Sequence, residues 1–200
     1  MITREQYQSI GTNYGHVCSW AFWEKVDKKP KSNIASMDVF DLDKNSNLLK
    51  TLQTDVIMVA LNFSRDITFQ KLFMNFHDSN PHAQDFKIRY AFEETPFYGA
   101  YMTDIIKDFP MLSSKDVLSH LKANPNDVTT QLNSFRKEIA FITADVPTIL
   151  AFGKQTFDIL KKGLNENEYL SLIQLTHYSH HISKEDYRKE IHIQLGINVS

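Results

Sequence analysis

The sequence predicts an α/β fold with three layers, α/β/α, around a central, mostly parallel four-stranded sheet. Four short apolar runs, each as long as one strand, recur after residue 54. Amphipathic stretches with helical spacing separate several of these runs, and such alternation is typical of crossover connections in a parallel sheet. The runs are apolar at nearly every position, which indicates strands that helices cover on both faces.

An N-terminal helical segment is expected before the sheet. Its opening, Thr3-Arg4-Glu5-Gln6, has the spacing of a capping box. Residues 27–54 then form the most linker-like part of the chain, so we expect one domain over 1–200 with residues 1–50 as a helical extension and linker. The helix prediction rests on apolar side chains at three- and four-residue steps: Tyr7, Ile10, Tyr14, Val17, Trp20, Ala21 and Trp23.

The remaining elements follow in order along the chain. Parallel strands are expected at 55–61, 99–106, 147–152 and 169–176, where the apolar runs lie. Helices are expected at 127–143 and 153–162. A last helix is expected from Ser183, as its N-cap, to Gly196, as the residue that follows its C-cap.

Composition excludes several classes of protein. The chain has 200 residues, of which 42% are hydrophobic, and a net charge of −2 from 22 basic and 24 acidic side chains. The length and the hydrophobic content fit one domain with a full core. The net charge argues against binding of nucleic acid through a broad basic surface, but it allows a local basic groove. The single cysteine, Cys18, excludes an intramolecular disulfide. Because no signal peptide and no run of about 18 apolar residues is found, we expect a cytoplasmic protein without a membrane partner.

Polar side chains stand at the carboxyl ends of the predicted strands, where ligands bind in open α/β sheets. Asn62 follows the first strand, Asp104 lies near the end of the second, and His177 and Ser179 follow the fourth. Amide, carboxylate, imidazole and hydroxyl groups together suit recognition of the edge of a planar polar ligand.

The same strand ends carry a family resemblance. Ala60-Leu61-Asn62-Phe63-Ser64 resembles the first motif of the uracil-DNA glycosylase superfamily, and His177-Tyr178-Ser179 resembles its second motif, His-Pro-Ser. The segments 99–107 and 147–154 are similar to the middle strand and to the strand-Gly-Lys element of that family. Four motifs in the right order, over residues 50–196, are more specific than any one of them.

The resemblance implies a protein that binds a flipped or single-stranded base of damaged or deaminated DNA and hydrolyses its N-glycosidic bond. It implies that His177 stabilises the leaving base and that Asn62 orients the attacking water. It implies no metal and no organic cofactor. The substrate-binding residues would be Phe63 beside Asn62, Phe76 as the stacking ring, Asp104 at the base edge, Ser179 at a phosphate and Ile182 as the wedge in the duplex.

Two departures from the family pattern affect specificity. Phe63 and Tyr178 replace the motif prolines, so two loops lose a fixed φ. Asp104 stands where the family has a base-reading asparagine. An ionised carboxylate only accepts hydrogen bonds, so Asp104 favours a base that presents N–H groups, unless a dry pocket keeps the carboxyl protonated.

Other interpretations remain open from the sequence. The chain could be a non-catalytic binding protein for a free nucleobase-like molecule. The three candidate residues could also have structural roles, with Asn62 as a turn residue, Asp104 as a helix cap and His177 as a structural histidine. The spacing His-x-x-His-His, which begins at His177, does not match that of a zinc-binding histidine pair on a helix. His77 and His82 are the other histidines considered as metal ligands. A DNA enzyme needs a basic rim, for which the candidates are Arg65, Lys107, Lys154 and Lys184.

Overall fold

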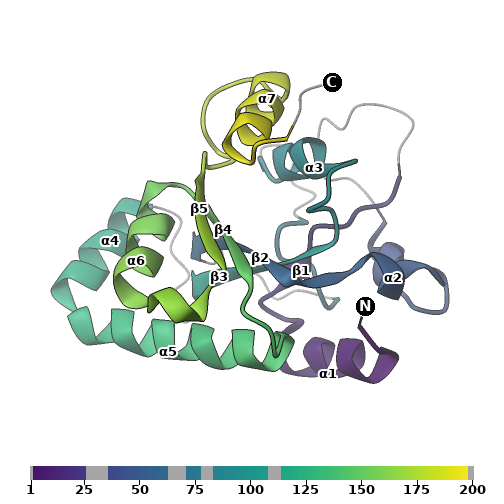
Figure 1. The fold of residues 1–200 in the computed structure, drawn as a ribbon, viewed down its shortest axis with the longest axis horizontal. Coiled ribbons are helices and arrows are strands. Elements are labelled where there is room, and N and C mark those ends of the chain that lie inside the picture. The colour runs from purple at the N-terminus through teal and green to yellow at the C-terminus, as the bar shows by residue number, and fades with distance from the viewer. Residues whose placement is uncertain (1, 26–35, 63–70, 78–82, 108–113, 198–200) are drawn as a thin grey trace.

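A five-stranded sheet forms the centre of the computed structural model, which describes residues 2–25, 36–62, 71–77, 83–107 and 114–197 (Figure 1). The strand order is β1-β3-β2-β4-β5, and the last four strands of this order are mutually parallel. The prediction of four strands was therefore wrong by one antiparallel strand at the β3 edge. The strands are β1 Ser19–Trp20, β2 Gln53–Asn62, β3 Ala100–Ile106, β4 Thr148–Phe152 and β5 Ser171–Leu175.

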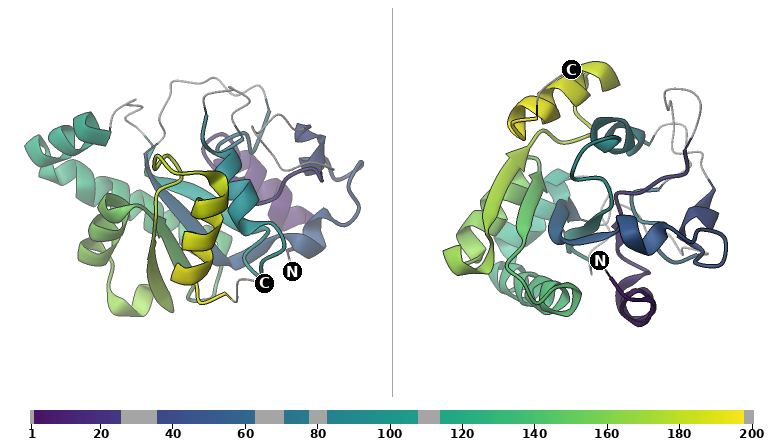
Figure 2. Two further views of the ribbon diagram at one scale, coloured as in Figure 1. Left: turned by 90° about the horizontal axis from the view of Figure 1, so that it is seen from above. Right: turned by 45° about the vertical axis from the view of Figure 1, so that its right-hand side comes forward.

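Helices cover both faces of the sheet, as the two further views make clear (Figure 2). The helices α1 Arg4–Tyr14, α4 Ser114–Ala123, α5 Pro125–Ile142 and α6 Lys154–Gly163 pack on one core. The helices α3 Phe86–Phe92 and α7 Lys184–Gln194 pack on the other core and against each other. The short helices are η1 Met37–Phe40, α2 Leu48–Thr51 and η2 Glu166–Glu168. The expected α/β architecture with helices on both faces is confirmed.

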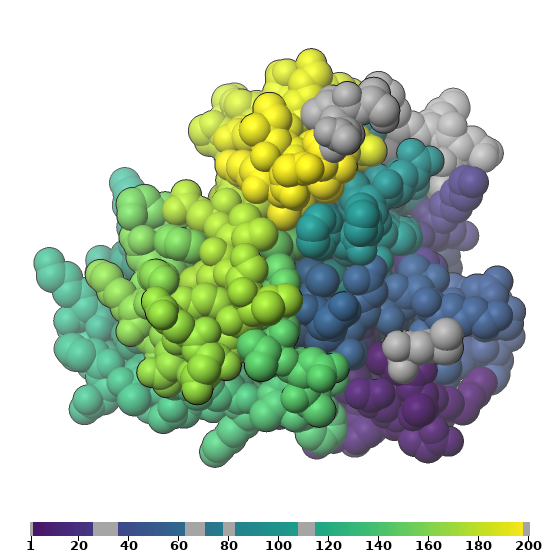
Figure 3. All heavy atoms as spheres, viewed as in Figure 1, coloured from purple at the N-terminus to yellow at the C-terminus, as the bar shows by residue number. Residues whose placement is uncertain are grey.

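The strand order positions the site. The connection from β2 to β3 carries α3 on one face of the sheet, and the connection from β4 to β5 carries α6 on the other face. Because these connections leave in opposite directions, the carboxyl ends of the neighbouring strands β2 and β4 form the topological switch point of the sheet, where ligands bind in open α/β folds. Figure 3 shows that α7, in yellow, lies directly against the teal segment that contains α3 above this part of the sheet.

The N-terminal segment departs from its prediction. Helix α1 ends at Tyr14, and Trp20 belongs to strand β1, where it pairs with Tyr101. The helical periodicity misled here because residues 18–21 are fully buried, so apolar side chains occur at consecutive positions and no single face can be recognised. Phe40 and Leu48, from the expected linker, also join the core.

The parallel strands and the helix ends agree closely with the sequence. Thr3 accepts a hydrogen bond from the Gln6 amide at 3.1 Å, and Ser183 accepts one from the Asp186 amide at 3.0 Å, so both N-caps are confirmed. Gly196, at φ +66°, follows the C-cap of α7 as expected. Among the helices described, none has the length and hydropathy needed to cross a membrane.

Candidate functional site

Two of the predicted site residues lie on one face of neighbouring strands. Asp104 in β3 has the same orientation as Ala100 and Met102, whose side chains face the α3 and α7 core. Asn62, the last residue of β2, has the orientation of Ala60, which pairs with Asp104 across the ladder. The sheet therefore brings these residues to the same face and the same edge.

His177 follows β5 by two residues and is held by the loop after it. Its Nδ1 atom accepts a hydrogen bond from the Ser179 backbone amide at 3.1 Å and lies 2.7 Å from the Ser179 Oγ atom. Because Nδ1 is an acceptor, the ring proton of the neutral imidazole is on Nε2. Burial lowers the pKa of His177 to about 4. At neutral pH, His177 is therefore an uncharged ring whose Nε2–H group is a donor, and no described residue accepts from it.

Gly153 allows this placement of His177. It stands at the end of β4 with φ +87° and ψ 155°, a conformation that favours glycine, and its amide donates to the Leu175 carbonyl at 2.7 Å. A Cβ atom at Gly153 would lie 3.4 Å from the His177 Cβ atom, so the ring packs directly on the glycine backbone. A hollow of about 600 Å³ opens here, lined by Gly153, Lys154, Thr176, His177, His181 and Glu190, among others.

Asp104 is a buried carboxyl group, only 2% exposed. Its Oδ2 atom accepts a hydrogen bond from the Asn75 side-chain amide at 2.8 Å. Burial raises the pKa of Asp104 to about 7, although the hydrogen bond from Asn75 and the positive charge of Lys107 oppose this shift. Asp104 can therefore be protonated near neutral pH, the condition under which a carboxyl group both donates and accepts hydrogen bonds.

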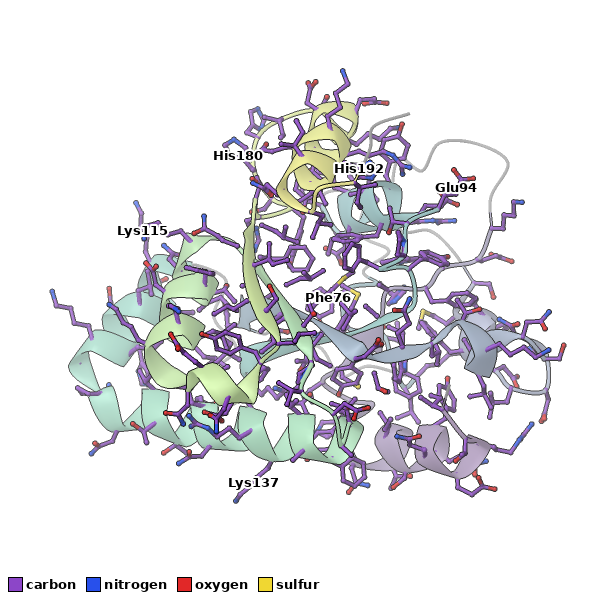
Figure 4. The ribbon with its side chains drawn as sticks, in the orientation of Figure 1. Phe76, Glu94, Lys115, Lys137, His180 and His192 are labelled. Atoms are coloured by element: carbon purple, nitrogen blue, oxygen red, sulfur yellow. The ribbon has the colours of Figure 1, made fainter. Side chains whose placement is uncertain are left out.

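Aromatic rings connect Asp104's side of the sheet with the His177 loop. Tyr178 stacks on His177 at 4.3 Å and meets Phe76 and Phe152 edge-on at 6.4 and 5.6 Å between ring centroids. Figure 4 shows Phe76 between the sheet and the α3/α7 layer. Phe76 has φ +63°, which is uncommon for a non-glycine residue, and it is only 5% exposed. Phe76 can therefore stack on a ligand ring only if the Tyr178 ring first moves away from it.

The other residues of the His177 loop are held by the protein itself. Ser179 has His177 as its partner, and Ile182 is half-buried against the α3/α7 core. The Lys87 ammonium donates to the His180 carbonyl at 2.8 Å, which ties the loop to α3. The roles of Ser179 at a phosphate and of Ile182 as a wedge stay predictions. A second hollow, of about 580 Å³, lies beside Ile182 and includes Phe86, Lys87 and Lys184 in its lining.

The basic rim is weaker than the sequence suggests. The Lys107 ammonium is 2.7 Å from the Glu138 carboxylate in α5, with only 13% of its side chain exposed. Lys154 pairs with Asp158 at 2.7 Å on the surface. Lys184 lies over the Tyr90 ring at 5.4 Å with 14% of its side chain exposed. Thus Lys107 and Lys184 are largely withdrawn from solvent.

Some predicted residues lie outside the described ranges. These are Phe63, Arg65 and His82. His77 is described and buried, 4.9 Å from the Trp23 ring, and its Nε2 atom lies 3.3 Å from the Trp20 carbonyl. Over the described ranges, no group of three or more histidine, cysteine, aspartate or glutamate side chains is arranged to hold a metal ion.

The structure adds three residues to the site: Asn75, Gly153 and Tyr178. Gly153 had a sequence signal, a glycine directly after a predicted strand, and Tyr178 lies inside the second motif. Asn75 had none, because its partners Val17 and Asp104 lie 58 and 29 residues away along the chain.

Comparison of the chain with protein-family models, with curated proteins and with solved structures finds no match. The resemblance to the uracil-DNA glycosylase superfamily therefore rests on the sequence motifs alone.

Proposed function

We propose that this chain recognises a flipped or single-stranded nucleobase and hydrolyses its N-glycosidic bond. The observation that carries the proposal is the state of His177, a neutral ring that is fixed by Ser179 and offers Nε2–H as a donor at the carboxyl edge of the sheet. Asp104 and Asn62 stand on the neighbouring strands β3 and β2, which β4 separates from β5, at the same carboxyl edge of the sheet.

The proposed chemistry follows from where charge develops. When the bond between the base and C1′ breaks, both electrons go to the base, and negative charge collects on its ring carbonyl. A positioned donor such as Nε2–H of His177 stabilises that charge without giving up its proton. Water adds to C1′ as hydroxyl and gives its other proton to bulk water, and the departing base anion takes a proton from solvent. The Asn62 carboxamide orients this water but cannot take the proton, because an amide is not a base at neutral pH.

A second candidate is a binding protein for a free nucleobase-like molecule at the same edge. The contacts of two lysines favour this candidate. Lys107 forms an ion pair with Glu138, and Lys184 contacts the Tyr90 ring and the Glu185 carboxylate. A protein that binds nucleic acid needs cationic side chains that are free to contact phosphates.

A cleavage assay distinguishes the two candidates. Oligonucleotides that carry uracil, hypoxanthine or xanthine are incubated with the wild type, with His177→Ala and with His16→Ala, a control at an exposed histidine after α1. We expect wild-type cleavage of at least one base, a loss of about 100-fold or more in His177→Ala, and no change in His16→Ala. Equal rates in all three proteins would refute the role of His177. No cleavage with retained binding of a free base would establish the second candidate.

A further inference from the structure

Lys87 is a buried lysine that the described residues leave without a counter-charge. It lies in α3, is 4% exposed, and donates from its Nζ atom to the His180 carbonyl at 2.8 Å. Over the described ranges, no carboxylate forms an ion pair with it. Burial lowers the pKa of Lys87, because the charged form is the one that loses water. A larger fraction of its amine is therefore neutral at neutral pH than in an ordinary lysine.

A hollow gives ligands access to Lys87. The side chain lines the space of about 580 Å³ beside Ile182, so burial in the fold does not close it off. This hollow shares Ser179 and His181 with the hollow at His177. The two spaces therefore lie next to each other along the same loop, and a group released at His177 has the Lys87 hollow beside it.

The contacts of the two lysines in this hollow differ. Lys184 lies over the Tyr90 ring at 5.4 Å, and its Nζ atom is 3.9 Å from the Glu185 carboxylate. A ring face and a carboxylate both favour an ammonium ion. The carbonyl that accepts from Lys87 accepts equally well from a neutral amine, which then keeps its lone pair free. Lys87 is therefore the nucleophile of this hollow, and Lys184 is a cation.

We propose that this hollow captures the open-chain aldehyde of an abasic sugar through an imine with Lys87. The inference rests on the proposed function, because hydrolysis of the N-glycosidic bond leaves a C1′ hydroxyl, and that sugar is in equilibrium with its open-chain aldehyde. The Lys87 nitrogen attacks C1′ and a C=N bond forms, while the aldehyde oxygen leaves as water with the two protons of the amine. The step consumes no oxidant or reductant, so addition of water reverses it and returns the free amine.

An oligonucleotide with a preformed abasic site tests the capture without any release of a base. It is mixed with the protein and sodium cyanoborohydride, which reduces an imine to a secondary amine that survives denaturing electrophoresis. We expect the wild type to form this adduct, and Lys87→Met and Lys87→Arg to form about tenfold less of it or lower. Lys87→Arg keeps a cation and a donor for the His180 carbonyl, so its loss separates imine formation from binding of a phosphate. Lys189→Met, at an exposed lysine of α7, is the control and should match the wild type.

Peptide mapping by mass spectrometry locates the adduct in the wild type, so the test does not depend on a variant that folds. The N-terminal amine is the competing nucleophile, because its ordinary pKa of about 7.7 to 8.0 leaves much of it neutral. An adduct at another amine, equal trapping in Lys87→Arg, or no adduct overturns the inference, and the proposed function stands if the wild type still releases a base. An adduct at Lys87 in a protein that releases no base removes the proposed function and supports the capture site.

Discussion

Gly153 is the residue on which the position of His177 depends most directly. Its φ of +87° with ψ 155° lies in a region almost restricted to glycine, and an added Cβ would touch the His177 ring at 3.5 Å. We expect Gly153→Ala to lower the free energy of unfolding by about 1 to 3 kcal/mol and to perturb His177 through the strained backbone, since a Cβ at 3.5 Å is in ordinary van der Waals contact with the ring and does not clash with it. Urea unfolding measures the first effect, and the imidazole NMR signals of His177 report the second.

Gly196→Ala is the control for this prediction. Gly196 also has positive φ, +66°, but nothing lies within 4 Å of the place that a Cβ atom would take there. Alanine at this position should therefore cost about 1 to 2 kcal/mol and leave the His177 signals unchanged. If both variants move the His177 signals equally, the effect is a general loss of stability, and the specific packing of His177 on Gly153 is refuted.

Residue types at strand ends could be predicted from the sequence, but their partners could not. Asn62, Asp104 and His177 were selected because polar side chains lie at or near the carboxyl ends of apolar runs. The hydrogen bond from Asn75 to Asp104 joins residues 29 positions apart, and no local pattern encodes such a contact. Because that bond determines which oxygen of Asp104 is available, the chemistry of the site depends on tertiary structure.

At the scale of elements, an ion pair joins α5 to the end of β3. Glu138 is 1% exposed, pairs with Lys107 at 2.7 Å, and accepts from the Tyr101 and Thr103 hydroxyls at 2.9 and 2.7 Å. Removing one partner leaves the other charge buried and unpaired. We therefore expect Glu138→Gln and Lys107→Met each to cost about 3 kcal/mol in the free energy of unfolding, measured by urea denaturation.

The double variant tests whether the two residues act as a pair. Glu138→Gln with Lys107→Met removes both charges, so its cost should be clearly less than the sum of the two single costs. Strict additivity would show that α5 and β3 are held by independent contacts. Lys154→Met, which breaks the exposed pair with Asp158, is the control and should cost less than about 1 kcal/mol.

Helix α3 and strand β1, which the sequence analysis did not predict, share one physical cause, which is that their burial is settled by distant partners. Helix α3 buries Lys87 and Arg89, at 4% and 2% exposure, because their charged ends reach the His180 and Glu24 carbonyls. Charged residues on the buried side obscure the amphipathic pattern. Strand β1 has only two residues and exists through its pairing with β3. By contrast, the four parallel strands carry their own signal, since burial on both faces requires continuous apolar runs.

At the scale of the whole molecule, three buried groups whose pKa values are shifted by burial make stability depend on pH. Burial lowers the pKa of His77 to about 3 and that of His177 to about 4, and it raises the pKa of Asp104 to about 7. The two histidines favour the folded state when neutral, and Asp104 favours it when protonated. The histidines and Asp104 therefore make opposing contributions to the pH dependence of stability.

These shifts predict how stability changes with pH. Between pH 5 and 6, the unfolded state binds two more protons at the histidines, whose ordinary pKa is 6.5, and one fewer at Asp104, whose ordinary pKa is 3.8. The net difference of one proton makes the free energy of unfolding rise with pH by about 1.4 kcal/mol per pH unit from these groups. Above pH 6.5 the histidine contribution is complete, and the Asp104 contribution continues to fall until pH 7.

Asp104→Asn isolates one side of this balance. Without the opposing carboxyl, the slope between pH 5 and 6 should double to about 2.7 kcal/mol per pH unit, and the decline between pH 6.5 and 7 should disappear. Urea denaturation at half-unit pH steps measures both slopes. Asp55→Asn, at an exposed carboxylate near the start of β2, should leave them as in the wild type. A wild-type slope in Asp104→Asn would mean that Asp104 is already ionised in the folded protein at pH 5.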